Sequence, residues 1–273
     1  MRIRIIDAFS DRPFAGNPAA VCLPPGPDWP DAGWMQRVAA EMNLSETAFA
    51  LPLPAGGEAD WGLRWFTPTT EVDLCGHATL ATTHALGQDG LLGRAPVRFA
   101  TRSGVLLARW AADRPVVLDL PAATLAEAPA GPEFEAALGA RVLVRFTSPE
   151  LDDDVLLLDS EQTVRGLAPD LAAVAALPAR GVVVTAPADD PAGGHDFVSR
   201  CFGPALGIPE DPVTGSAHTA LAPYWAQRLG RAEVTGYQAS ARGGLVLCEV
   251  ADGRVLLSGW AVTVLDGTLH SAP

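Results

Sequence analysis

The chain of 273 residues is long enough for one large domain or two of ordinary size, and its hydrophobic content of 48% suffices for a sizeable core. A formal net charge of −13 argues against nucleic acid or an anionic membrane surface as the main partner. The four cysteines are far apart and form no CxxC motif, which argues against a disulfide framework or a zinc site. The N-terminal residues become polar too early for a signal peptide, and no 18-residue apolar run occurs. We therefore expect a soluble cytoplasmic protein.

The first part of the chain predicts three short strands and one helix. Strands are expected at residues 2–9, 20–23 and 47–51, where apolar residues alternate or cluster between turns rich in Pro and Gly. A helix is expected at residues 31–42, because apolar side chains recur there at helical spacing. Glu46 stands where the third strand begins, just after this helix ends. A carboxylate at such a junction can point into a cleft; a solvated surface glutamate is the alternative interpretation.

The strongest local signal lies in residues 64–86. A strand and a loop containing Pro lead to a helix that opens at Gly76. The first turn of a helix has free N–H groups and the positive end of the dipole, so it suits an anion. His77 stands in that first turn, and Cys75 precedes it, where the dipole favours a thiolate. A capping histidine and a small packed cysteine are the alternative interpretations.

The same pattern occurs again in residues 200–222. The order Arg-x-Phe-x-Pro is present in both segments, and the GHA that opens the first helix becomes GSA at Gly215 and Ser216. Asp211 lies in the loop before this second helix. We therefore predict that the two halves of the chain form the same strand–loop–helix unit. If these two units face each other, two helix N-termini converge on one cleft, where N–H groups hold a small acid.

The remaining chain predicts many strands and few long helices, which indicates an α+β fold and argues against a Rossmann sheet. An Ala- and Pro-rich stretch at residues 121–132 is the best linker. It separates an N-terminal lobe, residues 1–120, from a C-terminal lobe, residues 121–259. The further predicted strands are 97–101, 104–111, 116–120, 141–146, 155–159, 182–185, 196–202, 243–250, 254–260 and 262–265. The further predicted helices are 133–138 and 169–177.

No motif in the sequence calls for a nucleotide, a metal or a flavin. A carboxylate and an imidazole together can move a proton and polarise a substrate, so His77 and Asp211 are candidates for such a pair. Ser216 and His218 do not make a Ser–His nucleophile, because side chains two apart on one helix diverge. The groups available for chemistry are Glu46, Cys75, His77, Asp211, Thr214, Ser216 and His218.

Four motifs carry a family resemblance: DAFSDRPFAGNPAAV, NLSETAF, RWFTPTTEVDLCGHATLATTHAL and GIPEDPVTGSAHTALAPYW. Together they resemble the phenazine-biosynthesis PhzF-like family, within the diaminopimelate epimerase and proline racemase superfamily. The resemblance implies two similar domains in a pseudo-twofold relation, each a curved mixed sheet around a central helix, with the active site between them. It implies that a final strand, at about residues 260–273, returns to the first lobe. It also implies a homodimer and a cofactor-independent isomerase that acts on a small carboxylic acid.

The resemblance also assigns roles to residues. The glutamate of NLSETAF, Glu46, is the general acid/base of the family. His77 and Asp211 orient the substrate and handle protons. Backbone or hydroxyl donors to the substrate carboxylate come from three residues: Gly76, Gly215 and Ser216.

Epimerases of the superfamily carry a cysteine at each helix start. Here Cys75 matches the first, but Thr214 replaces the second, so a two-thiol acid/base pair is excluded. We therefore predict that Glu46 shifts a proton within one small acid. The alternatives are a one-thiol racemase or epimerase led by Cys75, and a binding protein that has kept the site without turnover.

Overall fold

The computed structural model describes residues 1–271, and the chain divides into two compact units. The first unit contains Met1–Leu120 and the segment that begins at Ser258, and the second contains Pro121–Leu257. Both contain helices and mixed sheets, in agreement with the predicted α+β class. None of the helices among residues 1–271 is long and apolar enough to cross a membrane.

The first unit is a mixed sheet. Strand β1 pairs antiparallel with β2, β2 parallel with β3, and β3 antiparallel with β4. Strand β4 then pairs antiparallel with β5 and parallel with β6, and β6, β7 and β8 continue antiparallel. The strands are β1 (Arg2–Ala8), β2 (Asn17–Cys22), β3 (Glu46–Pro52), β4 (Trp61–Phe66), β5 (Glu71–Val72), β6 (Val97–Thr101), β7 (Gly104–Arg109), β8 (Val116–Pro121) and β18 (Ala261–Thr268).

Helix α2 (Gly76–Gln88) lies against the strands of this sheet, whereas α1 (Ala32–Met42) covers a smaller apolar cluster. Every residue of α2 from Gly76 to Gly87 except His84 is buried. The buried threonines of α2 avoid the cost of an unpaired hydroxyl because each donates to the carbonyl four residues earlier. A helix surrounded in this way is a rigid support for side chains at its first turn.

The second unit repeats this order of pairing. Strands β10 to β16 follow one another with the same parallel and antiparallel senses as β1 to β7. They are β10 (Val144–Ser148), β11 (Asp153–Leu157), β12 (Gly181–Pro187), β13 (Phe197–Gly203), β14 (Ile208–Asp211), β15 (Glu233–Gln238) and β16 (Gly244–Ala251), with β9 (Ala126–Ala128) and β17 (Arg254–Gly259). The helices are α3 (Pro132–Leu138), α4 (Glu161–Gly166), α5 (Leu171–Ala175) and α6 (Gly215–Leu229), with short 3₁₀ turns at Pro191–Gly193 and Pro204–Leu206.

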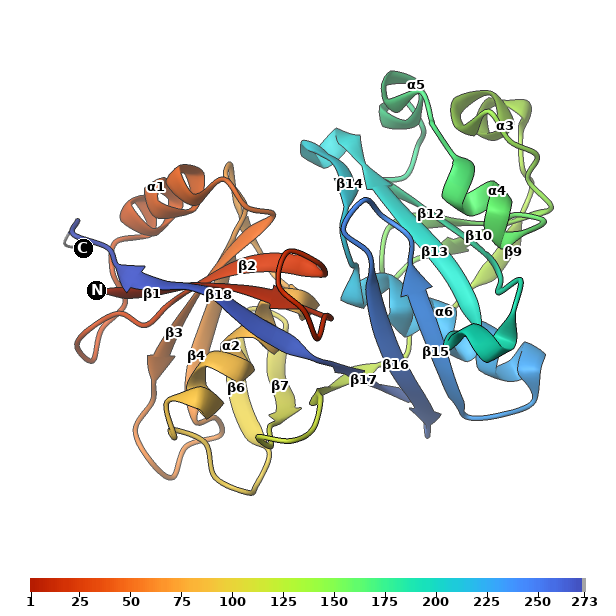
Figure 1. Ribbon diagram of the computed structural model, residues 1–273. Helices are drawn as coiled ribbons and strands as arrows, with labels where there is room; N and C mark the ends of the chain where they lie inside the picture. Colours follow the sequence, from red (N-terminus) through yellow and green to blue (C-terminus); the bar gives the residue numbers. More distant parts are fainter. Residues whose placement is uncertain (272–273) are drawn as a thin grey trace. The chain divides into compact units, whose positions relative to one another are not determined.

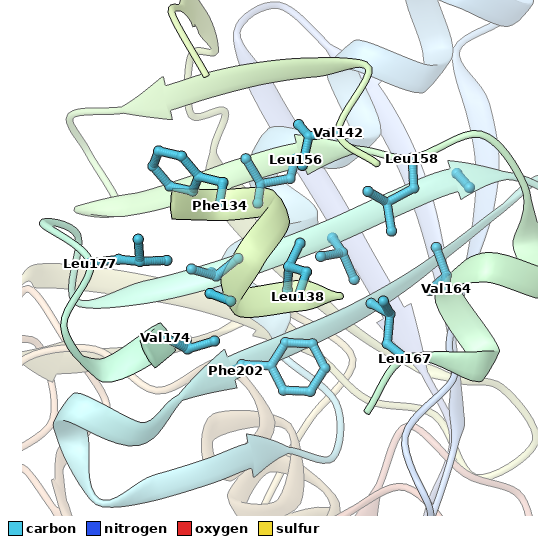
Figure 2. Close-up of a cluster of buried hydrophobic side chains, with 14 of the residues drawn as sticks. Phe134, Leu138, Val142, Leu156, Leu158, Val164, Leu167, Val174, Leu177 and Phe202 are labelled. Atoms are coloured by element: carbon cyan, nitrogen blue, oxygen red, sulfur yellow. The ribbon is translucent and has the colours of Figure 1, made fainter. Parts of the chain in front are cut away.

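The core of the second unit lies where α3, α4 and α5 meet its sheet. Phe134 and Leu138 of α3 pack over Leu156 of β11, and Phe202 of β13 belongs to the same cluster (Figure 2). Helix α6 packs against β15 and β16. Gly236 of β15 allows this approach, because a side chain there would meet Phe197 and His218 at under 3 Å.

The two predicted look-alike segments share a local structure. Arg64 holds Glu71 with two hydrogen bonds of 2.7 and 2.9 Å, and Arg200 holds Glu210 with the same two distances. Each guanidinium also lies over a phenylalanine two residues later in the chain. In both units a short strand, β5 or β14, follows and leads to the helix α2 or α6. The pseudo-twofold relation of the lobes stays a prediction.

Several elements differ from the sequence predictions. The predicted linker 121–132 contains the short strand β9, and β10 begins at Val144 rather than at residue 141. Helix α4 was not predicted; Ser160 caps it by accepting the amide proton of Thr163. Strand β15 was not predicted either, and it contains Gly236, a residue type that is depleted in strands. The short strands β5 and β14 pair with β4 and β13, and the local sequence pattern does not reveal such a pairing.

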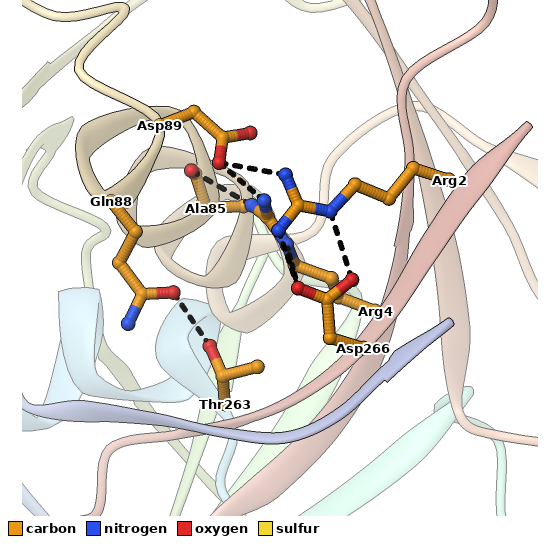
Figure 3. Close-up of polar contacts among 7 residues, drawn as sticks. All are labelled: Arg2, Arg4, Ala85, Gln88, Asp89, Thr263 and Asp266. Atoms are coloured by element: carbon orange, nitrogen blue, oxygen red, sulfur yellow. Dashed lines mark hydrogen bonds and ion pairs between the residues drawn. The ribbon is translucent and has the colours of Figure 1, made fainter. Parts of the chain in front are cut away.

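The C-terminal strand β18 lies beside β1 in antiparallel pairing (Figure 1). Figure 3 shows the ion pairs that hold it: Arg2 and Arg4 of β1 contact Asp266 of β18 and Asp89 at the end of α2. The Arg2 side chain lowers the pKa of Asp266 to about 2 by hydrogen bonding to its carboxylate. Arg4 is buried and also donates to the carbonyl of Ala85 at 2.9 Å. Strand β18 lies within the segment 260–273 that was predicted to return to the first lobe. Residues 272 and 273 of that segment lie outside the described residues.

Replacing Arg4 with Met should lower the free energy of unfolding by about 3 kcal/mol, because it leaves Asp89 and the Ala85 carbonyl without a buried partner. The midpoint of urea unfolding measures this change. Arg109→Met is the matched control: Arg109 is exposed on β7, so the same substitution there should cost less than about 0.5 kcal/mol. Equal midpoints for both variants would show that Arg4 does not anchor this strand.

Candidate active site

The first unit brings three predicted site residues together. Glu46 is the first residue of β3, Cys75 is the N-cap of α2, and His77 is the second residue of that helix. Helix α1 ends at Asn43, which adopts a left-handed conformation and turns the chain into β3. Pairing of β3 with β2 then sets Glu46 opposite Ala19. The carboxylate is therefore positioned by a strand and the imidazole by a buried helix.

His77 is the centre of this cluster. Its Nε2 atom lies 3.3 Å from Oε2 of Glu46, and its Nδ1 atom lies 3.4 Å from Sγ of Cys75. The side chains of His77 and Glu46 are only 5% and 13% exposed. Burial lowers the pKa of His77 to about 3, so its ring is neutral at pH 7. A neutral imidazole against a carboxylate can donate a hydrogen bond and help to place a proton.

Sequence reasoning missed a fourth member of the cluster. Nδ2 of Asn17 lies 3.2 Å from Nδ1 of His77, and Asn17 is completely buried at the start of β2. The motif DAFSDRPFAGNPAAV contains this residue, but nothing local in it shows that its amide contacts a helix 60 residues later. Only the packing of β2 against α2 reveals the contact.

The donor atoms of Glu46, Cys75 and His77 lie within 4.8 Å of one another, which makes the three side chains candidate metal ligands. Carboxylate, thiolate and imidazole are all zinc ligands, and a tetrahedral zinc ion would bring a sulfur and a nitrogen ligand to roughly 3.6 Å from each other. The 3.4 Å between Cys75 Sγ and His77 Nδ1 is close to that value, but Glu46 lies beside the other ring nitrogen, Nε2, and one ion cannot bind both nitrogens of a ring. This arrangement fits proton handling better than a shared metal.

The second unit builds a corresponding cluster at the start of α6. Thr214 is at the N-cap position and donates its hydroxyl to Oδ2 of Asp211 at 2.6 Å. Gln238, completely buried on β15, accepts the Thr214 amide proton at 2.8 Å and donates to the Asp211 carbonyl at 2.8 Å. Gly215 and Ser216 follow as the first two residues of the helix. Gln238 was also missed, because its partners lie 24 and 27 residues away.

His218 is buried in the first turn of α6. Its Nδ1 atom donates to the Thr214 carbonyl at 2.8 Å, and its ring packs against Phe197. Burial lowers the pKa of His218 to about 4, so this ring is also neutral at pH 7. It stabilises the first turn of α6 and does not activate Ser216.

The cysteines are all free and buried. Burial raises the pKa of Cys22 to about 12 and raises the pKa of Cys201 and Cys248 further, which keeps these three as thiols. Cys75 alone stands at a helix start beside a histidine. Thr214, its counterpart, uses its hydroxyl on Asp211, so the two positions do not offer a pair of thiols.

A family model described as phenazine biosynthesis-like protein matches residues 6–267. The chain belongs to this PhzC-PhzF family. It is 49% identical to an uncharacterized isomerase of Pseudomonas aeruginosa, over 97% of both sequences. It also resembles the crystal structure of a PhzF family protein from Enterococcus faecalis, with 41% identity, 97% coverage of both chains and a TM-score of 0.88. The predicted family and the predicted isomerase class agree with these relatives.

A more distant structure shares the fold alone. A probable proline racemase from Agrobacterium radiobacter superposes with a TM-score of 0.68 at 12% identity, covering 98% of this chain and 92% of that one. The likeness carries no information on the reaction of this chain.

The buried neutral His77 predicts a pH dependence of stability. The folded ring keeps its low pKa, whereas the unfolded ring takes up a proton below about pH 6.5. Stability from this residue is therefore complete above pH 6.5 and falls as the pH drops toward 3. Between pH 6 and 4 the loss should be roughly 1.4 kcal/mol per pH unit.

The variant His77→Gln should reduce the slope of unfolding free energy against pH by that amount, measured by urea unfolding at a series of pH values. Thr83→Val is the control, because Thr83 is buried on the same helix and cannot titrate. It should change stability without changing the slope. An unchanged slope in the His77 variant would contradict a neutral buried ring.

Proposed function

We propose that this protein is a cofactor-independent isomerase that moves a proton within a small carboxylic acid, with Glu46 as the general acid/base. The observation that supports this most is the contact between the Glu46 carboxylate and the buried, neutral His77. A carboxylate held this way has a fixed direction and little access to water. General acid/base catalysis by a positioned side chain contributes roughly 10²–10⁴-fold to a rate.

In the proposed reaction, Glu46 removes a proton from a carbon next to a carbonyl or an unsaturated system. The electron pair of the broken C–H bond moves into that system and forms an enolate-like anion. Glu46, now protonated, returns the proton to a different carbon of the same molecule. The overall step conserves every atom and needs no oxidant, reductant or cofactor.

The proposal includes donors that hold the substrate carboxylate and the developing negative charge. The first-turn N–H groups of α2 and α6 are suited to anions, and a glycine, Gly76 or Gly215, opens each helix. We assign Ser216 a hydroxyl donor role and Asp211 a substrate-orienting role. Each well-placed donor contributes roughly 2.7–4 kcal/mol in comparable sites. The net charge of −13 makes such local donors necessary for an anionic substrate.

The proposal extends to assembly and location: a homodimer in the cytoplasm. Support comes from the family resemblance and from the four buried cysteines, none of which is in a disulfide, as suits a reducing compartment.

A second candidate function is a one-thiol racemase or epimerase led by Cys75. The 3.4 Å contact between Cys75 Sγ and His77 Nδ1 favours it, because an imidazole beside a thiol can activate a thiolate. The low pKa of His77 opposes it, since a buried ring that resists protonation does not form a stable imidazolium–thiolate pair. We therefore prefer Glu46.

The test of the proposal is incorporation of deuterium from D₂O into a panel of small unsaturated or carbonyl-bearing carboxylic acids, followed by NMR. The wild-type protein should exchange hydrogen at a carbon of at least one acid. Glu46→Gln, which keeps the shape and removes the base, should reduce the rate roughly 10²–10⁴-fold. Glu41→Gln, on the exposed side of α1, is the matched control and should keep the wild-type rate. Full exchange by the Glu46 variant would refute the assignment.

The variant Cys75→Ala separates the two candidate functions in the same assay. If Glu46 is the base, removing the thiol should lower the rate by less than about tenfold, because only a packing contact and a weak hydrogen bond are lost. A loss comparable to that of Glu46→Gln would favour the thiol-led reaction. If neither variant nor the wild-type protein exchanges any acid that it binds, the protein is a binder without turnover.

A further inference from the structure

Asn17 is held rigidly where it contacts His77. It opens β2 and pairs with Ala8 at the end of β1. The preceding Gly16 has a φ of +66°, and a Cβ atom there would lie 2.1 Å from the Ala8 carbonyl oxygen, so only glycine permits this turn. The same strand pairs with β3, which begins at Glu46. One strand therefore connects the amide of Asn17 to the backbone that carries the proposed base.

The chemistry of the amide decides which nitrogen of His77 carries the proton. The Nδ2 group of Asn17 can only donate a hydrogen bond, so Nδ1 of His77 must accept it with its lone pair. A neutral imidazole that accepts at Nδ1 carries its hydrogen on Nε2. The Cys75 thiol, also next to Nδ1, is compatible with this state because an S–H group is a weak donor.

The opposite orientation of the amide is unfavourable. With the amide oxygen facing Nδ1, the ring would carry its hydrogen on Nδ1 and turn a bare Nε2 lone pair toward the Glu46 carboxylate. Two acceptors would then face each other at 3.3 Å in a buried site. With the amide nitrogen facing Nδ1, the ring hydrogen is on Nε2, which lies 3.3 Å from Oε2 of Glu46 and forms no hydrogen bond in this structure. The side chains around the ring are Asn17 from β2, Glu46 from β3 and Cys75 from the helix of His77 itself.

We propose that Asn17 is a positioning residue that fixes His77 in the Nε2–H tautomer, so that the ring carries an N–H group on the side of Glu46 and does not act as a second base. This inference rests on the proposed function for its catalytic meaning, whereas the tautomer itself is measurable without any substrate. Burial keeps the ring neutral at pH 7, so a single tautomer is a defined state of the site.

The test is ¹⁵N NMR of the histidine rings at pH 7, with the His77 signals assigned by comparison with His77→Gln. The wild-type spectrum should show a protonated Nε2 and an unprotonated Nδ1. In Asn17→Asp, the carboxylate accepts where the amide donated, so Nδ1 should become protonated and the ring should titrate at a higher pH. Gln162→Glu is the control, since it makes the same amide-to-carboxylate change at an exposed residue of α4, and it should keep the wild-type ring signals.

Activity gives the second readout. Asn17→Asp should slow solvent-hydrogen exchange roughly 10–100-fold, the range found when partners that orient metal-binding histidines are replaced. It should also move the acidic limb of the pH–rate profile toward neutral pH. A purely structural role would lower the rate without moving that limb.

The outcomes separate the inference from the proposed function. A wild-type His77 with its proton on Nδ1, or an Asn17→Asp spectrum that still shows the Nε2–H tautomer, would overturn the inference. The wild-type spectrum alone decides the first point even if the variant does not fold. The predicted tautomer in a protein that exchanges no acid would overturn the proposed function and leave the assignment of Asn17 to His77 intact.

Discussion

The proposed chemistry depends on one contact, that of the Glu46 carboxylate with the buried imidazole of His77. Both groups are costly to bury, and each is acceptable only because the fold holds it where a partner is present. A strand supplies the carboxylate and the first turn of a fully packed helix supplies the ring. Because burial keeps the ring uncharged, the pair is a base with a neutral donor and not a stable ion pair. In the proposed reaction, this difference leaves the carboxylate able to accept a proton from the substrate.

The second unit has different groups at the corresponding helix start. Where the first unit has a cysteine and a histidine at the helix start, the second has Thr214 and Ser216, and Thr214 is tied to Asp211 and Gln238. Thr214, Asp211 and Gln238 act on each other as hydrogen-bond donors and acceptors. The repeated pairing order of strands therefore supports two chemically different helix starts. In the proposed function, one of them moves the proton and the other orients the acid.

Much of this was predictable from the sequence, and the reasons are local. The start of α2 at Gly76 and that of α6 at Gly215 follow from small residues after loops, and α1 follows from apolar residues at helical spacing. Glu46 and His77 were identified through motifs. Asn17 and Gln238 were not, because each acts on a residue that strand pairing and packing bring close from far along the chain. Sequence patterns reveal which side chains lie at element ends but not which of them touch.

The most direct measurement of the central contact is an NMR titration of the His77 ring from pH 8 to pH 5. We predict that the His77 ring signals do not shift over this range, because the folded site holds the imidazole neutral. A protonation midpoint near 6.5, the value of a solvated histidine, would contradict it. The ring would then be charged beside Glu46, and the proposed base would instead be one half of an ion pair.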